Sequence, residues 1–264
     1  AQGDLVLQVD KIRKQFGGLT AVNDISFNIA AGQIVGLIGP NGAGKSTTFN
    51  MVNGQLKADK GSIRLEGTEL IGLRPREIWR LGVGRCFQIA ETFSSLTVIE
   101  NVQMALLSYD NQLFSFFKSA SHHARDKALA LLSQVGMQEQ ADRPCSELAY
   151  SDVKRVELAI ALANEPRLLL MDEPTAGMAP KERNDMMAMT KRLVIERGIA
   201  VLFTEHSMDV VFAYADRISV LARGRLIAHG TPDAIRDNRQ VQEVYFGGSS
   251  TFTLAPSSAT GASQ

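Results

Sequence analysis

Residues 34–47 read IVGLIGPNGAGKST, and this stretch decides how the rest of the sequence is interpreted. Ile34–Ile38 are continuously apolar, which is typical of a strand that is buried on both faces of a parallel sheet. Gly39–Ser46 then fit the pattern G-x-x-x-x-G-K-[ST], and a helical pattern begins at Lys45. In this order, a strand, loop and helix bind phosphate through backbone N–H groups and the helix N-terminus. The alternative is a glycine-rich turn that only connects a strand to a helix.

Each residue type in this loop has an expected role. The glycines let the backbone wrap closely around phosphate oxygens. We expect Lys45 to reach the β- and γ-phosphates of a nucleotide, Ser46 to ligate Mg²⁺ and Thr47 to make a further phosphate contact. The predicted phosphate-binding residues are Gly39, Pro40, Asn41, Gly42, Ala43, Gly44, Lys45, Ser46 and Thr47.

A second apolar strand, Leu168–Met171, ends in two acidic residues followed by Pro174. In open parallel sheets, functional residues gather at the carboxyl ends of the strands. Asp172 suits a carboxylate that holds Mg²⁺, and Glu173 suits a group that orients and polarises an attacking water. Adjacent acids also often mark a solvated strand end. It is the phosphate loop that favours the functional interpretation.

His206 follows the apolar strand Ile199–Phe203 by the short step Thr204-Glu205. We therefore expect it at the end of a neighbouring parallel strand, within reach of the γ-phosphate. The alternative for a single histidine is a structural or surface role.

An antiparallel region is predicted near the N-terminus. Leu5, Leu7 and Val9 are expected on one buried face of a strand, and similar alternation covers residues 25–29 and 63–65. This period-2 pattern, bounded by glycine-containing turns, is typical of half-buried antiparallel strands.

The remaining patterns predict one large domain. Continuously apolar strands separated by helical patterns favour βαβ units, whereas residues from about 90 to 165 are mostly helical. We predict an α/β fold: a P-loop NTPase core with a mainly parallel sheet, an N-terminal antiparallel β subdomain and an inserted helical subdomain. The domain is expected over residues 1–247. Residues 248–264 are rich in Ser, Thr, Ala and Gly, and we expect a disordered tail there.

Composition narrows the function classes. The 264 residues include 28 Lys plus Arg and 28 Asp plus Glu, so the formal net charge is zero. Domains that bind nucleic acid usually carry a basic excess, so no nucleic-acid partner is expected. Cys86 and Cys145 fit no metal pattern and are expected to be reduced thiols. The apolar stretches are strand-length, well short of the roughly 20 residues that span a bilayer, and the start shows no signal-peptide pattern. Any work at a membrane is therefore expected to go through a partner.

Together these residues resemble the ABC-transporter ATPase family over residues 5–247. Gly39–Thr47 is similar to the Walker A motif, and Leu168–Glu173 is similar to Walker B with the catalytic glutamate after it. The resemblance implies that Gln88 is the Q-loop glutamine, which helps to bind Mg²⁺ and links the core to the helical insert. It implies that His206 is the switch histidine.

The family pattern also implies a set of site residues. Phe16 occupies the place of the aromatic that stacks on adenine, and the alternative is a core residue. The implied catalytic residues are Lys45, Gln88, Glu173 and His206. The implied metal ligands are Ser46, Gln88 and Asp172.

The family's signature motif, usually Leu-Ser-Gly-Gly-Gln, is altered here. Leu148–Asp152 read LAYSD, and in the family this loop opens a helix whose N-terminus faces the γ-phosphate held by the other subunit. The resemblance therefore places Ala149 and Ser151 against nucleotide in trans. Ala149 lacks the serine hydroxyl, for which Ser151 could partly substitute; Ser151 also replaces a glycine, which could crowd the nucleotide or forbid a positive φ. Ala179 stands where the D-loop usually carries an aspartate. A slow or degenerate site remains open.

Several stretches resemble the branched-chain amino acid importer ATPases. Importers of urea, amides or aromatic acids share these features, and the lipopolysaccharide-export ATPase is a nearby relative. The stretches are residues 16–22, 84–88, 96–102, 173–178 and 244–247.

The resemblance implies ATP and Mg²⁺ as ligands and a peripheral location on the cytoplasmic face of the inner membrane. The implied partners are a second ATPase subunit, identical or not, two transmembrane permease subunits and, indirectly, an external solute-binding protein.

Three other functions compete with this importer. One is a nucleotide-gated module that closes on ATP but scarcely hydrolyses it, and another is the ATPase of an exporter. The third is a soluble ABC protein that acts on DNA or the ribosome. Such proteins typically carry tandem ATPase domains, long coiled coils or basic extensions, none of which the sequence indicates.

Overall fold

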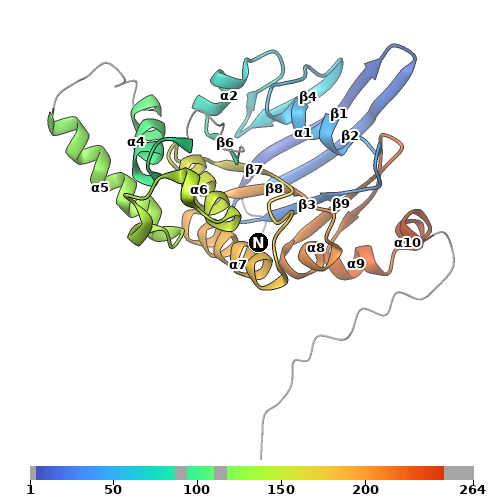
Figure 1. The fold of residues 1–264 in the computed structure, drawn as a ribbon. Coiled ribbons are helices and arrows are strands. Elements are labelled where there is room, and N and C mark those ends of the chain that lie inside the picture. The colour runs from blue at the N-terminus through green and yellow to red at the C-terminus, as the bar shows by residue number, and fades with distance from the viewer. Residues whose placement is uncertain (1–3, 87–93, 110–117, 247–264) are drawn as a thin grey trace, which may run out of the picture.

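The computed structural model describes residues 4–86, 94–109 and 118–246, and it contains two sheets (Figure 1). The smaller sheet is antiparallel and has the strand order β2-β1-β4-β5. Its strands are β1 (Leu5–Phe16), β2 (Leu19–Ala30), β4 (Lys60–Leu65) and β5 (Thr68–Glu69).

The larger sheet has the order β10-β9-β3-β8-β7-β6 and is mainly parallel, as predicted. Only its edge strand β10 pairs antiparallel, with β9, among the described residues. The strands are β3 (Ile34–Ile38), β6 (Val83–Cys86), β7 (Leu168–Asp172), β8 (Ala200–Thr204), β9 (Arg217–Ala222) and β10 (Arg225–Gly230).

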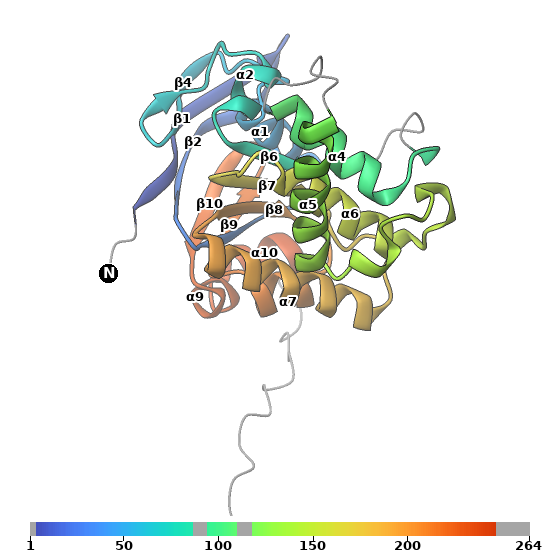
Figure 2. The ribbon, with the colours of Figure 1, turned by 90° about the vertical axis from the view of Figure 1, so that its left-hand side faces the viewer.

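The helices form two main groups around the larger sheet. Helices α4, α5 and α6 lie together at one side of the molecule, whereas α7 to α10 cover the sheet face opposite the antiparallel sheet (Figures 1 and 2). The described part of the segment between β6 and β7 contains helices and one isolated bridge. The helices are α1 (Lys45–Val52), α2 (Pro75–Arg80), α4 (Val98–Tyr109), α5 (Lys118–Gln134), α6 (Tyr150–Leu162), α7 (Pro180–Arg197), α8 (Met208–Tyr214), α9 (Pro232–Arg236) and α10 (Arg239–Phe246), with short 3-10 turns at Gln138–Gln140 and Cys145–Glu147.

Strand β3 lies between two hydrophobic cores. Ile34 and Ile38 pack into the core that the larger sheet shares with the helices, whereas Val35 and Leu37 pack into the core between the two sheets. Successive side chains of a strand point to opposite faces, so a strand covered on both sides must be apolar throughout. This explains the unbroken apolar run that precedes the phosphate loop.

One prediction for the antiparallel sheet is wrong. The sequence places Leu5 on the buried face with Leu7 and Val9, but Leu5 is 46% exposed and Val6 is buried. The β1–β2 pairing is irregular between Leu5 and Leu7, and this irregularity breaks the alternation.

Within the described residues, no helix combines the length and the apolarity needed to cross a membrane. Both cysteines are free. Burial raises the pKa of Cys86 to about 12, so its thiol stays protonated and unreactive at neutral pH.

Replacing Ile34 with Ala should lower the free energy of unfolding by about 2–5 kcal/mol, because the change leaves a cavity in the central strand. Ile34 is fully buried, whereas Ile195 on α7 is 65% exposed, so Ile195→Ala is the matched control with an expected change below about 0.5 kcal/mol. Urea unfolding followed by circular dichroism measures both. Equal losses would contradict the placement of Ile34 in the core.

Candidate functional site

The phosphate loop leaves β3 and enters α1. Gly44 precedes α1 with a left-handed backbone, at φ 103°, and its carbonyl accepts from the N–H of Thr48 at 2.9 Å. A Cβ atom at Gly44 would lie 2.8 Å from the carbonyl oxygen of Ala21, and one at Gly39 would lie 2.4 Å from that of Leu221. Only glycine fits these positions without moving the neighbouring backbone.

Lys45 folds back over this loop. Its Nζ donates to the carbonyl of Gly39 and to that of Pro40, the latter at 3.2 Å. Burial lowers the pKa of Lys45 below its ordinary value, and the negative charges of Glu173 and Asp172 oppose this shift. Lys45 and Glu173 line the same cavity, so the loop and the acid-tipped strand meet at one end of the sheet.

Thr204 holds both acidic residues in place. Strands β7 and β8 run parallel with Asp172 opposite Thr204. The Thr204 hydroxyl donates to Asp172 Oδ1 at 2.5 Å, and the Glu173 N–H donates to the Thr204 carbonyl at 3.0 Å. The end of β8 thus fixes the two carboxylates relative to each other.

Glu173 and His206 face each other at this sheet end. His206 Nε2 lies 2.7 Å from Glu173 Oε1, and the two side chains are 60% and 42% exposed. Glu173 has a left-handed backbone, at φ 47°, which costs a non-glycine residue about 1–3 kcal/mol. A carboxylate and an imidazole in contact, open to a ligand, can orient a water and exchange protons with it.

A cavity of about 630 Å³ joins these groups, and its volume suits a small-molecule ligand. Among its lining residues are those predicted from the sequence at Phe16, Asn41–Thr47, Glu173 and His206. Phe16 is 46% exposed, so the alternative interpretation of this residue as part of the core is wrong. The full lining is Phe16, Leu19, Thr20, Ala21, Asn41, Gly42, Ala43, Gly44, Lys45, Ser46, Thr47, Glu173, His206, Arg223 and Gly224.

Five of the predicted site residues that the structure describes do not line this cavity: Gly39, Pro40, Ala149, Ser151 and Asp172. Ala149 precedes α6 as its N-cap, and Ser151 lies in the first turn of that helix, where its Oγ donates to Glu182 Oε1 at 3.2 Å. Ser151 does not have a positive φ, so its backbone does not require glycine, whereas crowding of a nucleotide by its side chain stays a prediction. Gln88 lies outside the described residues.

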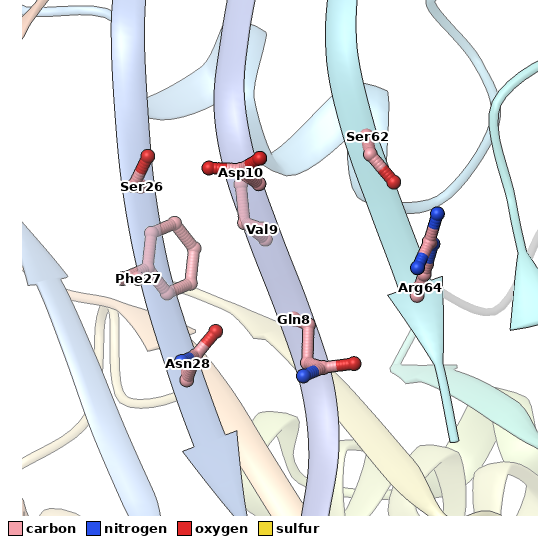
Figure 3. Close-up of a pocket in the computed structure, with 8 residues that line it drawn as sticks. All are labelled: Gln8, Val9, Asp10, Ser26, Phe27, Asn28, Ser62 and Arg64. Atoms are coloured by element: carbon pink, nitrogen blue, oxygen red, sulfur yellow. The ribbon is translucent and has the colours of Figure 1, made fainter. Parts of the chain in front are cut away.

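A second cavity, of about 440 Å³, lies on the antiparallel sheet and contains none of the predicted site residues. Figure 3 shows that its lining comes from neighbouring strands β2, β1 and β4. Val9 and Phe27 in this set are buried in the core between the sheets, so the polar side chains form the solvated face of a twisted sheet. These polar residues are Gln8, Asp10, Ser26, Asn28, Ser62 and Arg64.

The β9–β10 turn adds a part of the site that the sequence analysis missed. Arg223, at φ 49°, and Gly224 both line the larger cavity. The Gly224 N–H donates to the Ala43 carbonyl at 2.9 Å, and the Gly224 carbonyl accepts from the N–H of Asn23 at 2.7 Å. An Arg-Gly step between apolar runs signals a turn, but its contact with the phosphate loop depends on the pairing of β9 with β3.

Comparison with known proteins identifies the family. The family model described as ABC transporter matches residues 22–176, more than half of the chain. The chain belongs to the ABC transporter family. A second model, described as branched-chain amino acid ATP-binding cassette transporter, matches residues 225–250.

Curated relatives of this ABC protein match over nearly its whole length. The branched-chain amino acid transport ATP-binding protein LivG of Escherichia coli K12 is 39% identical over 92% of this chain and 98% of its own length. BraF of Pseudomonas aeruginosa, which carries the same description, is 38% identical with the same coverage. The phosphonates import ATP-binding protein PhnC 1 of Rhodopseudomonas palustris is 38% identical over 87% of this chain and 85% of its own.

Solved structures agree with this assignment. The ADP conformation of MJ1267, an ATP-binding cassette of an ABC transporter, superposes with a TM-score of 0.83 at 31% identity, covering 92% of this chain and 99% of that one. A dimeric post-hydrolysis state of the cassette MJ0796, bound to ADP and Pi, gives a TM-score of 0.72 at 25% identity, covering 86% and 98%. The predicted fold class is therefore confirmed. The chain is the ATP-binding subunit of an ABC transporter and an ATPase.

Replacing Gly44 with Ala in this ABC ATPase should weaken ATP binding by about tenfold or more. The left-handed backbone opposes any Cβ by about 1–2 kcal/mol, and the clash with the Ala21 carbonyl displaces the loop. Titration with a fluorescent ATP analogue measures the affinity. Gly18→Ala is the matched control, because a Cβ there meets no atom within 4 Å and φ is not positive, and it should bind as the wild type does.

Replacing Arg223 with Gln should weaken nucleotide affinity by about 3- to 10-fold, because the change removes a positive charge from the wall of the cavity that the phosphate loop lines. Arg225 is exposed at the start of β10 and does not line the cavity, so Arg225→Gln is the control. When the titration is repeated at higher salt, the difference in nucleotide affinity between the wild type and Arg223→Gln should become smaller. Equal affinities for both variants at low salt would exclude a nucleotide contact by Arg223.

Proposed function

We propose that this ATPase binds Mg-ATP in the larger cavity and closes head to tail with a second ATPase subunit to drive two transmembrane permease subunits. The observation that carries the proposal is that the Lys45 loop and the Glu173–His206 pair line one cavity at one end of the parallel sheet. The cavity connects them, so a nucleotide whose phosphates lie on the loop has its γ-phosphate directed toward Glu173 and His206.

The residues at this sheet end fit a magnesium ion. Mg²⁺ prefers oxygen ligands and usually keeps several waters, so it needs only one or two protein groups besides the phosphates. Ser46 offers a hydroxyl and Asp172 a carboxylate already oriented by Thr204; Gln88 is proposed from the family pattern alone. When bound, Mg²⁺ neutralises charge on the phosphates.

The chain's own groups divide the chemistry between them. Lys45 and the loop N–H groups hold the phosphates and stabilise the charge that builds up during transfer. Glu173 orients a water and polarises it for attack. His206, in contact with Glu173 at 2.7 Å, keeps the carboxylate in position and faces the transferring phosphoryl group.

The closed pair requires the signature helix of a partner. Helix α6 begins at Tyr150, and its backbone N–H groups and helix dipole survive the altered signature sequence. In this proposal, Ala149 and Ser151 face nucleotide held by the other subunit. The dimeric state of the MJ0796 cassette supports such a pair, and the second copy is either this chain or a sister ATPase.

A second candidate, the nucleotide-gated module with weak hydrolysis, has one observation in its favour. The N-cap residue Ala149 offers no side-chain hydrogen bond, and the Ser151 hydroxyl donates to Glu182. Both hydroxyl positions that could supply a donor to the γ-phosphate are therefore lost or engaged. Losing one such donor can cost on the order of 10²–10³ in rate.

The proposed solute is a branched-chain amino acid or a related small polar solute, taken up by import. Identity alone does not decide the solute, because PhnC 1 is as similar as BraF. The match of residues 225–250 to the branched-chain model and the longer coverage of LivG favour the amino acid. Import implies an external solute-binding protein and a position on the cytoplasmic face of the inner membrane, with the permeases as the anchor.

Replacing Glu173 with Gln should lower ATP turnover by about 10²- to 10³-fold and leave ATP affinity nearly unchanged, because the amide cannot polarise the attacking water. Phosphate release is measured with the transporter reconstituted from the ATPase and its permeases, with EDTA as the metal-free arm. Equal turnover in the variant and the wild type would favour the nucleotide-gated module over the motor.

A further inference from the structure

Glu205, between Thr204 and His206, is a buried carboxylate outside the predicted site. It is only 4% exposed, and acidic residues are almost never fully buried without hydrogen-bond partners or a counter-charge. Its partners in the described structure are backbone N–H groups and one hydroxyl. Breaking one of these bonds would leave a buried polar atom without a partner, which is costly, so the side chain holds its donors firmly.

Each carboxylate oxygen of Glu205 bonds a different turn. Oε1 accepts from the N–H of Thr175 at 2.9 Å and from the Thr175 hydroxyl. Oε2 accepts from the N–H of His206 at 3.2 Å and lies 3.5 Å from that of Ser207. One side chain therefore bridges the turn that follows β7, which begins with Glu173, and the turn that follows β8, which carries His206.

The turn after β7 is itself rigid and leads into α7. The N–H of Ala176 donates to the Glu173 carbonyl at 3.2 Å, and that of Met178 donates to the Thr175 carbonyl at 3.2 Å. Arg183 in the first turns of α7 donates to the Ser207 hydroxyl at 3.0 Å. Two contacts therefore join the region before and at the start of α7 to the His206 turn. One is the hydrogen bond between Arg183 and Ser207, and the other, which is buried, is the bond between Glu205 and Thr175.

We propose that Glu205 is a positioning residue that makes the turns Glu173–Met178 and Glu205–Ser207 one unit and so fixes the contact between Glu173 and His206. This inference rests on the proposed hydrolysis at Glu173 and His206. Because Glu205 is buried beneath both turns, it acts through them and touches no phosphate.

The variant Glu205→Gln separates this role from simple packing. Glutamine has the same shape, but it has one acceptor oxygen and an NH₂ donor. N–H groups from both turns donate to Glu205. The oxygen of the new glutamine can accept from only one of the two turns, and its NH₂ group then faces the N–H groups of the other turn, with which it cannot form a hydrogen bond. We expect the variant to fold but to lose the connection between the two turns.

Hydrogen–deuterium exchange tests the link without any turnover. In Glu205→Gln, the segments 173–178 and 204–208 should both exchange at least several-fold faster than in the wild type. Glu139→Gln, on an exposed 3-10 turn, is the matched control and should change neither. Faster exchange in only one segment, or in neither, would overturn the proposal.

Turnover of the reconstituted transporter tests the consequence. We expect kcat of Glu205→Gln to fall about 10- to 100-fold, since small misplacements of catalytic groups cost that much, while KM for ATP stays within about twofold. A loss confined to KM, or a kcat equal to that of Glu139→Gln, would refute a positioning role. If the wild type itself does not hydrolyse ATP, the proposed function fails, and the exchange measurement still decides the role of Glu205.

Thr175→Val provides a milder variant should Glu205→Gln not fold. It removes one hydroxyl from Oε1 and keeps the backbone donor. We expect a smaller fall in kcat in the same direction, with KM for ATP within about twofold of the wild-type value, and a kcat equal to that of the wild type would contradict the proposal. Where Glu205→Gln does fold, the double variant should lose less than the product of the two single losses, because both changes act on one link. If the two losses in kcat simply multiplied in the double variant, the proposed bridge between Glu205 and Thr175 would be contradicted.

Discussion

The register between β7 and β8 sets the functional contacts at this end of the sheet. Asp172 lies opposite Thr204 and accepts a hydrogen bond from its hydroxyl. This register brings the residues that follow the two strands together, Glu205 with Thr175 and His206 with Glu173. A slip of one residue would turn every side chain of a strand to the other face. The two cores prevent this, because Leu168 and Leu170 pack between the sheets while Leu169 and Met171 pack against the helices.

The site residues that directly follow a strand buried on both faces could be predicted from the sequence. The apolar runs before Gly39 and before Asp172 leave few alternatives to a parallel sheet, and function in such sheets gathers at the carboxyl ends. The short strand Val83–Cys86 was not indicated, since Gly84 and Arg85 break the apolar pattern and its pairing with β7 comes from tertiary contacts. The misplacement of Leu5 has a similar cause, because a pairing irregularity leaves no trace in composition.

The groups missed at the site share a physical reason. Arg223 reaches the cavity only because β9 lies beside β3, and Glu205 becomes a bridge only because β7 and β8 end at the same level. Neither residue type is unusual at its place in the sequence. Their roles depend on contacts between segments about thirty to two hundred residues apart, which propensity and spacing do not encode.

The cavity wall is shared by segments of both sheets, with Phe16 and Leu19–Ala21 from the antiparallel sheet and the phosphate loop and Arg223 from the parallel one. A ligand that touches both sides acts as a clamp between the layers. Its binding stabilises the folded domain as a whole, by an amount that rises with the logarithm of the ligand concentration relative to Kd, and does not only order a single loop. For the nucleotide proposed to bind here, its free concentration thereby contributes to the stability of the contact between the two sheets.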